Sequence, residues 1–541
     1  MNRLVVMALF LVQAFCVWGE TLTIKVNSKY LNIPVSHKTD RRRLTLTAKG
    51  EDTLSVVVRI AASAPDYWVF KDVSRYKGKK LELNYDGSKQ ALENIVQSDS
   101  IFGASSMYRE ENRPQFHFTA RRGWINDPNG LVWHNGLYHL YYQHNPFERE
   151  WENMTWGHAT SPDLLHWTEH DDVLFPDRLG TMYSGSAVFD EHNTSGFGTE
   201  KCPPLVYAYT ADRSDRETQC IAYSLDGGMT LQKYEGNPVI DSHDKWQTHD
   251  TRDPRLLWYA PGKHWVLVLN ERDGHSIYSS SNLKDWAFES HVTGFWECPD
   301  LFELPVDGNP DNTRWVMYGA SNTYMIGSFD GKTFKPEGGK YRFCTGTIYA
   351  AQTISHVPDG RRIQIGWGRV SHPGMPFNGM MLLPTELKLR TTADGIRLTS
   401  QPVSEVQSLL ENVFSSSDVL TADAANRMLE PLRQRDGLHL TFTLHLNHRT
   451  SAGLSLSGRN ILDYDSNFNT INGQFYSPQD PTSMDLTADI YIDRTSVEVF
   501  IDDGLYSYSM EWHEKKPEGL RFWGTNLTVS GLKVDRIRGI W

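Results

Sequence analysis

The sequence predicts an all-β chain in which a small N-terminal β-module precedes a β-propeller and a C-terminal β-sandwich. Apolar and polar residues alternate over short runs, Gly and Pro turns separate the runs, and a hairpin-like motif recurs at blade-sized intervals. The length of 541 residues exceeds what one hydrophobic core normally organises, so several domains are expected.

The N-terminal segment, residues 20–110, has the simplest pattern. Residues 21–26 (TLTIKV) and 54–60 (LSVVVRI) are β-rich, and the first of these runs alternates with a period of two. No group of chemically reactive side chains stands out here. The segment is therefore expected to be a β-module, and its role is unknown.

A motif recurs between residues 111 and 400. Residues 161–167 (SPDLLHW) resemble 280–286 (SSNLKDW), and 224–228 (SLDGG) resemble 328–331 (SFDG). Each copy sets Ser and then Asp or Asn before a turn, which is the layout of a β-hairpin tip. The copies start 63, 56 and 48 residues apart. Four-stranded blades of roughly 40–50 residues plus insertions fit this spacing and predict a propeller, whereas unrelated hairpins of a sandwich are the alternative.

The remainder of the chain divides into a connection and a last domain. Val406, Leu409, Leu410 and Val413 have helical spacing, which predicts a linker helix over residues 401–414. Alternating strands return in residues 415–541, where a β-sandwich of ordinary size is expected.

Residues 1–19 have the features of an export signal. Arg3 precedes an apolar run of residues 4–15, and we expect cleavage after Gly19, with export to the periplasm or the medium. The run is too short to span a bilayer, and no transmembrane segment is predicted. Lipid anchoring through Cys16 is an alternative outcome of the same targeting.

Charge and cysteine content exclude several classes of partner. A net charge of −12 argues against nucleic acid and anionic membranes as partners, and the aromatic content of 12% suits a sugar-binding site. The four cysteines beyond the signal match no zinc spacing. Cys202 and Cys220 could form a disulfide in an oxidising compartment, and both states remain open.

Three segments place a carboxylate beside aromatic residues or prolines. They are residues 124–130 (WINDPNG, with Asp127), 251–254 (TRDP, with Asp253) and 295–300 (FWECPD, with Glu297). Taken singly, they could be a capped turn, a surface ion pair and a half-buried Glu. Together they supply the carboxylates of glycoside hydrolysis, including a proton donor among apolar neighbours. Strands of different blades converge on the propeller axis, so these residues can meet despite their separation.

These segments, in this order, resemble the signature motifs of glycoside hydrolase family 32, the invertase, inulinase and levanase group. The resemblance covers about residues 115–541 and implies a five-bladed propeller followed by a sandwich. It implies that Asp127 is the nucleophile of a retaining mechanism, Glu297 the general acid/base, and Asp253 the stabiliser of the transition state. No metal or organic cofactor belongs to that mechanism.

The resemblance also implies a substrate pocket. Its expected members are Trp124, Asn126, Gln143, Trp151, Tyr183, Ser184, Arg252 and Trp367. The sequence departs from the family pattern at Glu152, where Gly is usual, and at Tyr183, where Phe is common. The subsites beyond the first fructose therefore cannot be carried over from the family.

The expected function is that of an exo-acting fructan β-fructosidase, which hydrolyses terminal fructose from levan, inulin or sucrose. Endo-levanase or endo-inulinase, fructosyltransferase and an inverting arabinan hydrolase are the enzymatic alternatives. A fructan-binding propeller without activity is the non-enzymatic one, although a binding protein does not require a proton donor. The sequence predicts no particular oligomeric state.

Overall fold

The computed structural model describes residues 19–432, 437–478, 480, 482–513 and 519–541. The chain forms two compact units. The boundary between them in the sequence lies between Ala104 and Ser105, six residues before the predicted end of the N-terminal module. The predicted export signal lies outside the described residues except for Gly19. In the described part of the chain, no helix has the length and apolar character needed to cross a membrane.

The first unit consists of two small antiparallel sheets. Their elements are β1 (Glu20–Lys25), β2 (Tyr30–Val35), β3 (Arg42–Ala48), β4 (Leu54–Val58), β5 (Tyr67–Asp72), the 3-10 helix Ser74–Tyr76, β6 (Lys80–Tyr85), α1 (Lys89–Glu93) and β7 (Val96–Ser98). The strand orders are β1-β6-β3-β4 and β5-β2-β7. Alternation in β3 and β6 buries Leu44, Leu46, Leu81 and Leu83 on one face, as expected for a sheet with one solvated side.

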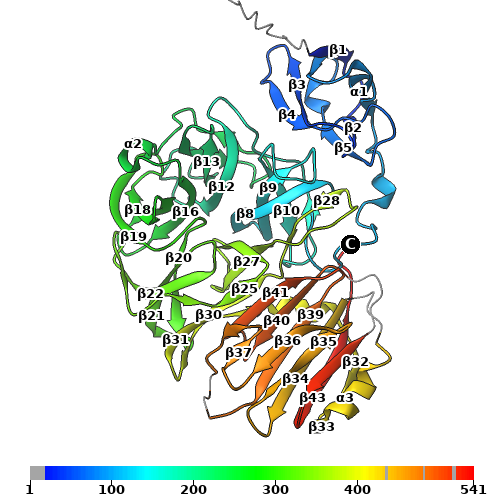
Figure 1. The fold of residues 1–541 in the computed structure, drawn as a ribbon. Helices are drawn as coiled ribbons and strands as arrows, with labels where there is room; N and C mark the ends of the chain where they lie inside the picture. The colour runs from blue at the N-terminus through cyan, green and yellow to red at the C-terminus, as the bar shows by residue number, and fades with distance from the viewer. Residues whose placement is uncertain (1–18, 433–436, 479, 481, 514–518) are drawn as a thin grey trace, which may run out of the picture. The chain divides into compact units, whose positions relative to one another are not determined.

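The second unit begins with a series of largely antiparallel sheets, cyan to yellow-green in Figure 1. After the 3-10 helix Ala104–Ser106, the elements are β8 (Gly123–His134), β9 (Leu137–Asn145), β10 (Thr155–Ser161), β11 (Thr168–Glu169), β12 (Thr181–Phe189), β13 (Leu205–Asp212), β14 (Glu217–Ser224), β15 (Gln232–Lys233), α2 (His243–Trp246), β16 (Thr251–Tyr259), β17 (His264–Glu271), β18 (Gly274–Ser280), β19 (Ala287–Thr293), β20 (Asp300–Val306), β21 (Asn309–Tyr318), β22 (Thr323–Phe329), β23 (Phe334–Pro336), β24 (Tyr341–Arg342), β25 (Cys344–Gly346), β26 (Ile348–Thr353), β27 (Arg362–Gly368), β28 (Phe377–Asn378), β29 (Met380–Met381), β30 (Thr385–Thr392) and β31 (Gly395–Pro402).

These strands pair mainly with their neighbours in sequence. The sheets have the orders β11-β10-β9-β8-β28, β12-β13-β14-β15 and β16-β17-β18-β19. The strands β20–β24, β26, β27 and β29–β31 are joined into one ten-stranded sheet by a parallel contact between Val306 and Leu389. Repeated up-and-down sheets are the architecture that the spacing of the hairpin motif predicts.

The recurring motif occupies the same place in successive sheets. Its copies begin at Ser161, Ser224, Ser280 and Ser328 and lead from β10 to β11, β14 to β15, β18 to β19 and β22 to β23. In the first copy, the Asp163 carboxylate accepts hydrogen bonds from two backbone N–H groups of the turn. An Asx-type turn of this kind explains why Asp or Asn recurs after Ser. The sequence prediction of hairpin tips is confirmed.

The C-terminal part of the second unit, yellow to red in Figure 1, is built from two sheets. Its elements are β32 (Leu410–Ser415), β33 (Leu420–Thr421), α3 (Ala422–Leu429), β34 (Gly437–Leu446), β35 (Ser451–Leu456), β36 (Arg459–Asp465), β37 (Thr470–Ile471), β38 (Gln474–Phe475), β39 (Leu486–Ile492), β40 (Ser496–Ile501), β41 (Tyr506–Glu511), β42 (Leu520–Gly524) and β43 (Leu527–Ile537). The orders are β25-β41-β40-β39-β34-β43-β32 and β38-β37-β36-β35-β42, and residues of both sheets share one apolar core. This arrangement is the predicted β-sandwich.

The predicted linker helix over residues 401–414 is wrong. The end of β31, a six-residue 3-10 helix (Ser404–Leu409) and β32 occupy this segment. Val406 and Leu409 are buried, but β32 pairs with β43, and Val413 is exposed. Pairing with a strand more than 100 residues away satisfies the backbone, and this tertiary contact overrides the local helical spacing.

The possible disulfide between Cys202 and Cys220 is not formed. Both cysteines are free, since the Cys202 side chain is exposed and the Cys220 side chain is fully buried. Burial raises the pKa of Cys220 to about 12, so that this thiol stays protonated and unreactive near neutral pH.

A buried charge cluster joins the two parts of the second unit. His117 lies ahead of β8, and its ring nitrogens contact the carboxylates of Asp493 at 2.7 Å and Glu498 at 2.6 Å. Burial disfavours the imidazolium, but the hydrogen bonds and charges of both carboxylates outweigh it and raise the pKa of His117 to about 9. The cluster therefore holds a protonated histidine at neutral pH.

The stability of the protein should depend on this proton. The pKa of His117 is raised in the folded chain, so its contribution is complete below the ordinary value of 6.5 and is lost as pH rises to about 9. We expect His117→Gln to lower the free energy of unfolding by about 2–4 kcal/mol at pH 6 and by much less at pH 9.5. Thermal unfolding from pH 5 to 10 measures this. His166→Gln, which removes an exposed His–Asp pair, should have little effect at any pH.

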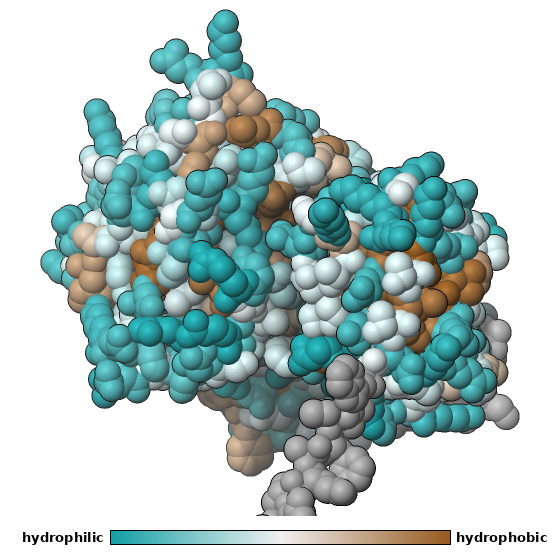
Figure 2. Space-filling view, turned by 90° about the horizontal axis from the view of Figure 1, so that it is seen from above, coloured by the Kyte–Doolittle hydropathy of each residue, from teal (hydrophilic) through white to brown (hydrophobic). Residues whose placement is uncertain are grey.

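The surface agrees with the polar composition. On the face that Figure 2 shows, hydrophilic residues cover most of the area and hydrophobic residues form small separate patches. Exposed large apolar side chains include Trp151, which is itself a predicted site residue, and Trp296, which precedes the predicted site residue Glu297.

Candidate active site

A pocket of about 320 Å³ opens where several strands of the second unit begin. It is lined by Asn126, Asp127, Gln143, Trp151, Tyr183, Ser184, Glu217, Arg252, Asp253, Glu297, Tyr349 and Trp367. These residues come from β8, β9, β12, β14, β16, β26 and β27 and from the loops before β10 and β20. The structure thus brings together side chains that are up to 241 residues apart, from Asn126 to Trp367.

Every site residue predicted from the sequence lines this pocket except Trp124. The indole Nε1 of Trp124 donates a hydrogen bond to Oδ1 of the lining residue Asn126 at 2.8 Å. Its ring also packs edge-on against Trp367, with the ring centroids 5.8 Å apart. The residue therefore supports two of the lining side chains, Asn126 and Trp367.

The strands that carry the pocket residues share a backbone irregularity. The antiparallel register shifts beside Asp127 in β8, Ser184 in β12, Asp253 in β16 and Tyr349 in β26. Shifts of this kind are β-bulges, which turn a side chain away from the regular alternation of the strand. Pro128 and Pro254 follow two of the acids, in positions where a regular strand would not accept proline.

Positive backbone φ angles concentrate at the same place. Asp253 has φ 68°, Glu297 has φ 49° and Cys298 has φ 40°. Non-glycine residues pay a conformational cost in this region, and the surrounding contacts must maintain it. Such strain at two carboxylates and the cysteine next to them is typical of a functional site.

Asp127 is held by two neutral donors. Asn126 Nδ2 donates to one carboxylate oxygen at 3.0 Å and Ser184 Oγ donates to the other at 2.7 Å. Burial raises the pKa of Asp127, these hydrogen bonds oppose the rise, and the charge of Glu297 adds to it. The donors fix the orientation of the carboxylate and favour its anionic form.

Asp253 lines the pocket and contacts Cys298. The backbone N–H of Cys298 donates to Asp253 Oδ2 at 2.9 Å, and the thiol lies 3.5 Å from the same oxygen and 3.7 Å from Asp127 Oδ2. Burial and then the charges of Glu297 and Asp127 raise the pKa of Asp253 to about 8. The ligand-free site therefore tends to hold a proton on Asp253 near neutral pH.

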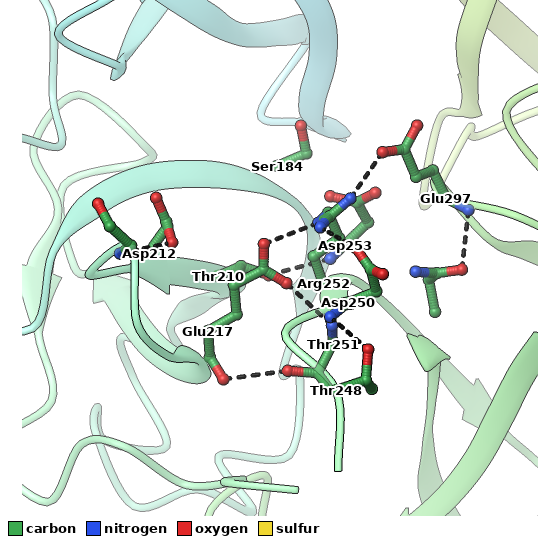
Figure 3. Close-up of polar contacts among 12 residues, drawn as sticks. Ser184, Thr210, Asp212, Glu217, Thr248, Asp250, Thr251, Arg252, Asp253 and Glu297 are labelled. Atoms are coloured by element: carbon green, nitrogen blue, oxygen red, sulfur yellow. Dashed lines mark hydrogen bonds and ion pairs between the residues drawn. The ribbon is translucent and has the colours of Figure 1, made fainter. Parts of the chain in front are cut away.

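Glu297 is fixed from two sides. Arg252 Nη1 donates to Glu297 Oε1 at 2.7 Å, and the Tyr349 hydroxyl donates to Oε2 at 2.6 Å. Arg252 also contacts the carboxylates of Glu217 and Asp250. Figure 3 shows its guanidinium between these two carboxylates and that of Glu297. Both donors keep the Glu297 side chain in one orientation at the pocket wall.

Sequence reasoning missed Glu217, Tyr349 and the part played by Cys298. Glu217 begins β14, and Tyr349 lies in the short strand β26, so neither stands in a recognisable motif. No local pattern could have found them, because only the arrangement of the sheets brings them to the pocket. Cys298 adjoins Glu297 in sequence, and its position beside a predicted acid is the one available signal.

We expect Asp253→Asn to stabilise the folded protein while it impairs the site. The pKa of Asp253 is raised from 3.8 to about 8, so its contribution to stability declines as pH rises between these values. An asparagine cannot ionise, so the variant does not lose stability in this way. The unfolding free energy of Asp253→Asn should exceed that of the unmodified protein by an amount that grows from pH 4 to pH 8 and reaches about 1–3 kcal/mol at pH 7. Thermal unfolding across this range is the measurement.

The matched control is Asp330→Asn, which changes an exposed turn residue. Backbone hydrogen bonds from Thr333 and Lys332 lower the pKa of Asp330, so this substitution should bring no stabilisation at any pH. A stability gain for Asp253→Asn that is the same at pH 4 and pH 8 would contradict the explanation by ionisation.

Comparison with known proteins identifies the family. Residues 117–402 match the model of the glycosyl hydrolases family 32 N-terminal domain. The chain is 35% identical over 494 residues to a levanase of Bacillus subtilis. The alignment covers 81% of this chain and 72% of the levanase. The chain belongs to glycoside hydrolase family 32. An extracellular exo-inulinase of Aspergillus niger is a further family 32 relative, 33% identical over 476 residues, covering 73% of this chain and 88% of the exo-inulinase.

Solved structures of family 32 agree in fold. An exo-inulinase from Aspergillus awamori superposes with a TM-score of 0.71 at 28% identity and covers 80% of this chain and 100% of that structure. A fructofuranosidase variant from Schwanniomyces occidentalis, complexed with fructosylnystose, gives a TM-score of 0.68 at 26% identity and covers 80% of this chain and 99% of that structure. The prediction that the chain is a glycoside hydrolase of family 32 is confirmed.

Proposed function

We propose that the protein is a retaining, exo-acting β-fructosidase that removes terminal β-D-fructofuranosyl residues from levan, inulin or sucrose. The proposal rests above all on one observation, that Asp127, Asp253 and Glu297 line a single pocket. The relatives named levanase and exo-inulinase support fructans as the substrate class.

In the first step, the Asp127 carboxylate attacks the anomeric C2 of the terminal fructose. Glu297 gives its proton to the departing oxygen, and the bond from C2 to that oxygen breaks. The hydrogen bonds from Asn126 and Ser184 present the attacking carboxylate in a fixed direction. The product of this step is a covalent fructosyl-enzyme together with the shortened chain or glucose.

In the second step, Glu297 takes a proton from water as the water oxygen attacks C2. The ester bond to Asp127 breaks, fructose leaves with its configuration retained, and both carboxyl groups return to their starting states. Asp253 binds hydroxyl groups of the fructose ring and stabilises the positive charge that develops on it. Arg252 and Tyr349 hold Glu297 in place through both steps.

The size of the pocket favours exo action. A volume of about 320 Å³ lies at the low end of the roughly 300–1,000 Å³ of ligand pockets and suits a terminal sugar rather than the middle of a chain. Gln143, Asn126 and Ser184 are buried in its depth, whereas Trp151 is 49% exposed and stands at its rim. A pocket that holds one terminal fructose ring admits only the end of a chain, so that fructose units are removed one at a time.

The products formed from levan and inulin test this proposal. We expect fructose alone at all times of the reaction, with retained anomeric configuration in the first product seen by NMR. A ladder of oligosaccharides at early times would instead identify an endo-acting enzyme, and chain lengthening at high sucrose would identify a fructosyltransferase. No turnover of any fructan or of sucrose would leave a binding protein.

We further propose that the strands from β8 to β31 form five propeller blades and that the protein is exported. The fifth blade would consist of β26, β27, β30 and β31, which follow one another in the ten-stranded sheet and its side branch. The relatives described as extracellular exo-inulinases support export. A crystal structure tests the blade count, and fractionation of the native host tests the location.

A further inference from the structure

A second pocket lies at the far ends of strands that begin at the active site. In β12, Ser184 lines the active-site pocket and Val188 lines the second pocket. In β16, Asp253 lines the active-site pocket and Tyr259 lines the second pocket. Six residues of extended strand span about 20 Å. The two pockets therefore open at opposite ends of the same strands, and the second one is no extension of the first.

A buried ion pair lies between the two pockets. Arg255 Nε stands 3.0 Å from Asp300 Oδ1, and these side chains are 3% and 0% exposed. The Arg255 guanidinium also donates to the backbone oxygen and the hydroxyl of Thr353, both at 3.0 Å. The Asp300 carboxylate is thus in direct contact with Arg255, whose side chain lines the second pocket.

Aromatic rings form one wall of the second pocket. The ring centroids of Trp315 and Phe329 are 5.0 Å apart, those of Tyr259 and Phe329 are 5.5 Å apart, and those of Tyr259 and Trp315 are 6.1 Å apart. Trp258 lines the same space. The pocket has a volume of about 450 Å³, which exceeds that of the active-site pocket and is enough for a small organic ligand.

Arg362 is the cation of this pocket that lacks a direct acceptor. Its Nε is buried and has no hydrogen-bond partner among the residues that the structure describes. The guanidinium lies over the ring of Phe302, 5.2 Å from the centroid. Burial lowers the pKa of Arg362 to about 10, with the charge of Asp300 opposing and that of Arg255 adding to the effect. An anion placed here would relieve the desolvation of the guanidinium.

The guanidinium of the neighbouring Arg361, by contrast, has hydrogen-bond acceptors within the protein. Arg361 contacts the carboxylates of Asp359 and Glu405 at 2.7–3.0 Å and does not line the pocket. Within the second pocket, Glu303 is the remaining carboxylate, and it accepts a hydrogen bond from Thr313 and is exposed. Among the described residues, no carboxylate pairs with Arg362, and its donor positions are free to meet a ligand.

We propose that this second pocket binds an anionic saccharide, that is, a sugar ring that carries a carboxylate or a phosphate group. The anion accepts hydrogen bonds from Arg362, because a guanidinium offers a planar pair of donors that matches both groups. The apolar C–H face of the ring packs against the wall formed by Tyr259, Trp315 and Phe329. The site acts independently of fructan hydrolysis, so this inference does not rest on the proposed function.

Titration of the purified full-length protein tests the inference by calorimetry and tryptophan fluorescence. The probes are D-glucuronate and glucose 6-phosphate, with D-glucose and inorganic phosphate as controls that lack the charge or the ring. We expect one of the charged sugars to bind with one-to-one stoichiometry, more tightly than either control. Comparison of the two charged sugars distinguishes a carboxylate ligand from a phosphate ligand.

Variants assign the binding to this pocket. Arg362→Gln should weaken binding about tenfold or more, whereas the adjacent Arg361→Gln should change it less than about twofold. Both variants should hydrolyse sucrose at the rate of the unmodified protein, so that loss of binding is separable from loss of activity. Should Arg362→Gln not fold, Arg362→Lys keeps the charge without the paired donors and should still weaken binding about threefold.

Several results would overturn the inference. Absence of binding at millimolar concentrations excludes the site, and equal affinity for glucose and the charged sugars excludes the anion contact. Equal affinity for inorganic phosphate and glucose 6-phosphate excludes the contribution of the aromatic wall. Equal effects of the Arg361 and Arg362 substitutions place the binding elsewhere.

Discussion

Replacing Asp127 by asparagine is expected to lower kcat for sucrose and fructans by roughly 10⁴-fold or more. An amide cannot attack C2 to form the covalent intermediate, although it has nearly the shape of the carboxylate. Asn126 and Ser184 donate to the two oxygens of Asp127, and after the substitution the amide keeps a carbonyl oxygen for one of these donors only. Because the amide has nearly the shape of the carboxylate, substrate should still bind. The loss should therefore appear in kcat far more than in KM.

The control for this experiment is Asp163→Asn. Asp163 caps a hairpin turn, is more than one-third exposed as a side chain and lies outside the pocket. Its replacement should leave kcat within about twofold of the original value. An Asp127→Asn protein that retains full activity after mass spectrometry has excluded deamidation would remove Asp127 from the role of nucleophile.

Replacing Glu297 by glutamine is the second change with a large expected effect. The amide cannot protonate the departing oxygen, so kcat/KM for sucrose and fructans should fall about 10²–10⁴-fold. An aryl β-fructofuranoside with an acidic phenol as leaving group needs little protonation and should lose much less in the first step. The ratio of the two losses measures how much Glu297 contributes as an acid.

Tyr349→Phe provides a graded comparison at the same carboxyl group. The substitution removes the 2.6 Å hydrogen bond to Glu297 Oε2 but leaves the proton donor in place. We expect a loss of about tenfold that is similar for both leaving groups. If Glu297→Gln slows the aryl substrate as much as it slows sucrose, Glu297 is not the group that protonates the leaving oxygen.

Much of the architecture could be predicted because its signals are local. Alternation with a period of two indicates strands, and the Ser-x-Asp turn indicates the tips between β10 and β11 and between β14 and β15. The linker helix failed for the opposite reason. The spacing of Val406 and Leu409 is local, but the pairing of β32 with β43 joins segments far apart in the chain.

The candidate site shows the same division. The motifs around Asp127, Asp253 and Glu297 are visible in the sequence, and family resemblance extends them to pocket residues such as Gln143. Glu217 and Tyr349 carry no motif, and the bulges that aim the site residues depend on how two strands pair. Likewise, no pattern in the sequence indicates the aromatic wall or the buried guanidinium of the second pocket.

The amino-acid sequence by itself determined the β-class of the chain, the positions of its hairpin tips and the three acids, since each depends on residues adjacent in the chain. Only the tertiary structure decided which side chains share a pocket and which charges meet. Arg252 contacts Glu297 across 45 positions, and Asp253 acquires its raised pKa from burial and from the charges of Glu297 and Asp127. Burial and electrostatic coupling act through space, and the order of residues does not encode them locally.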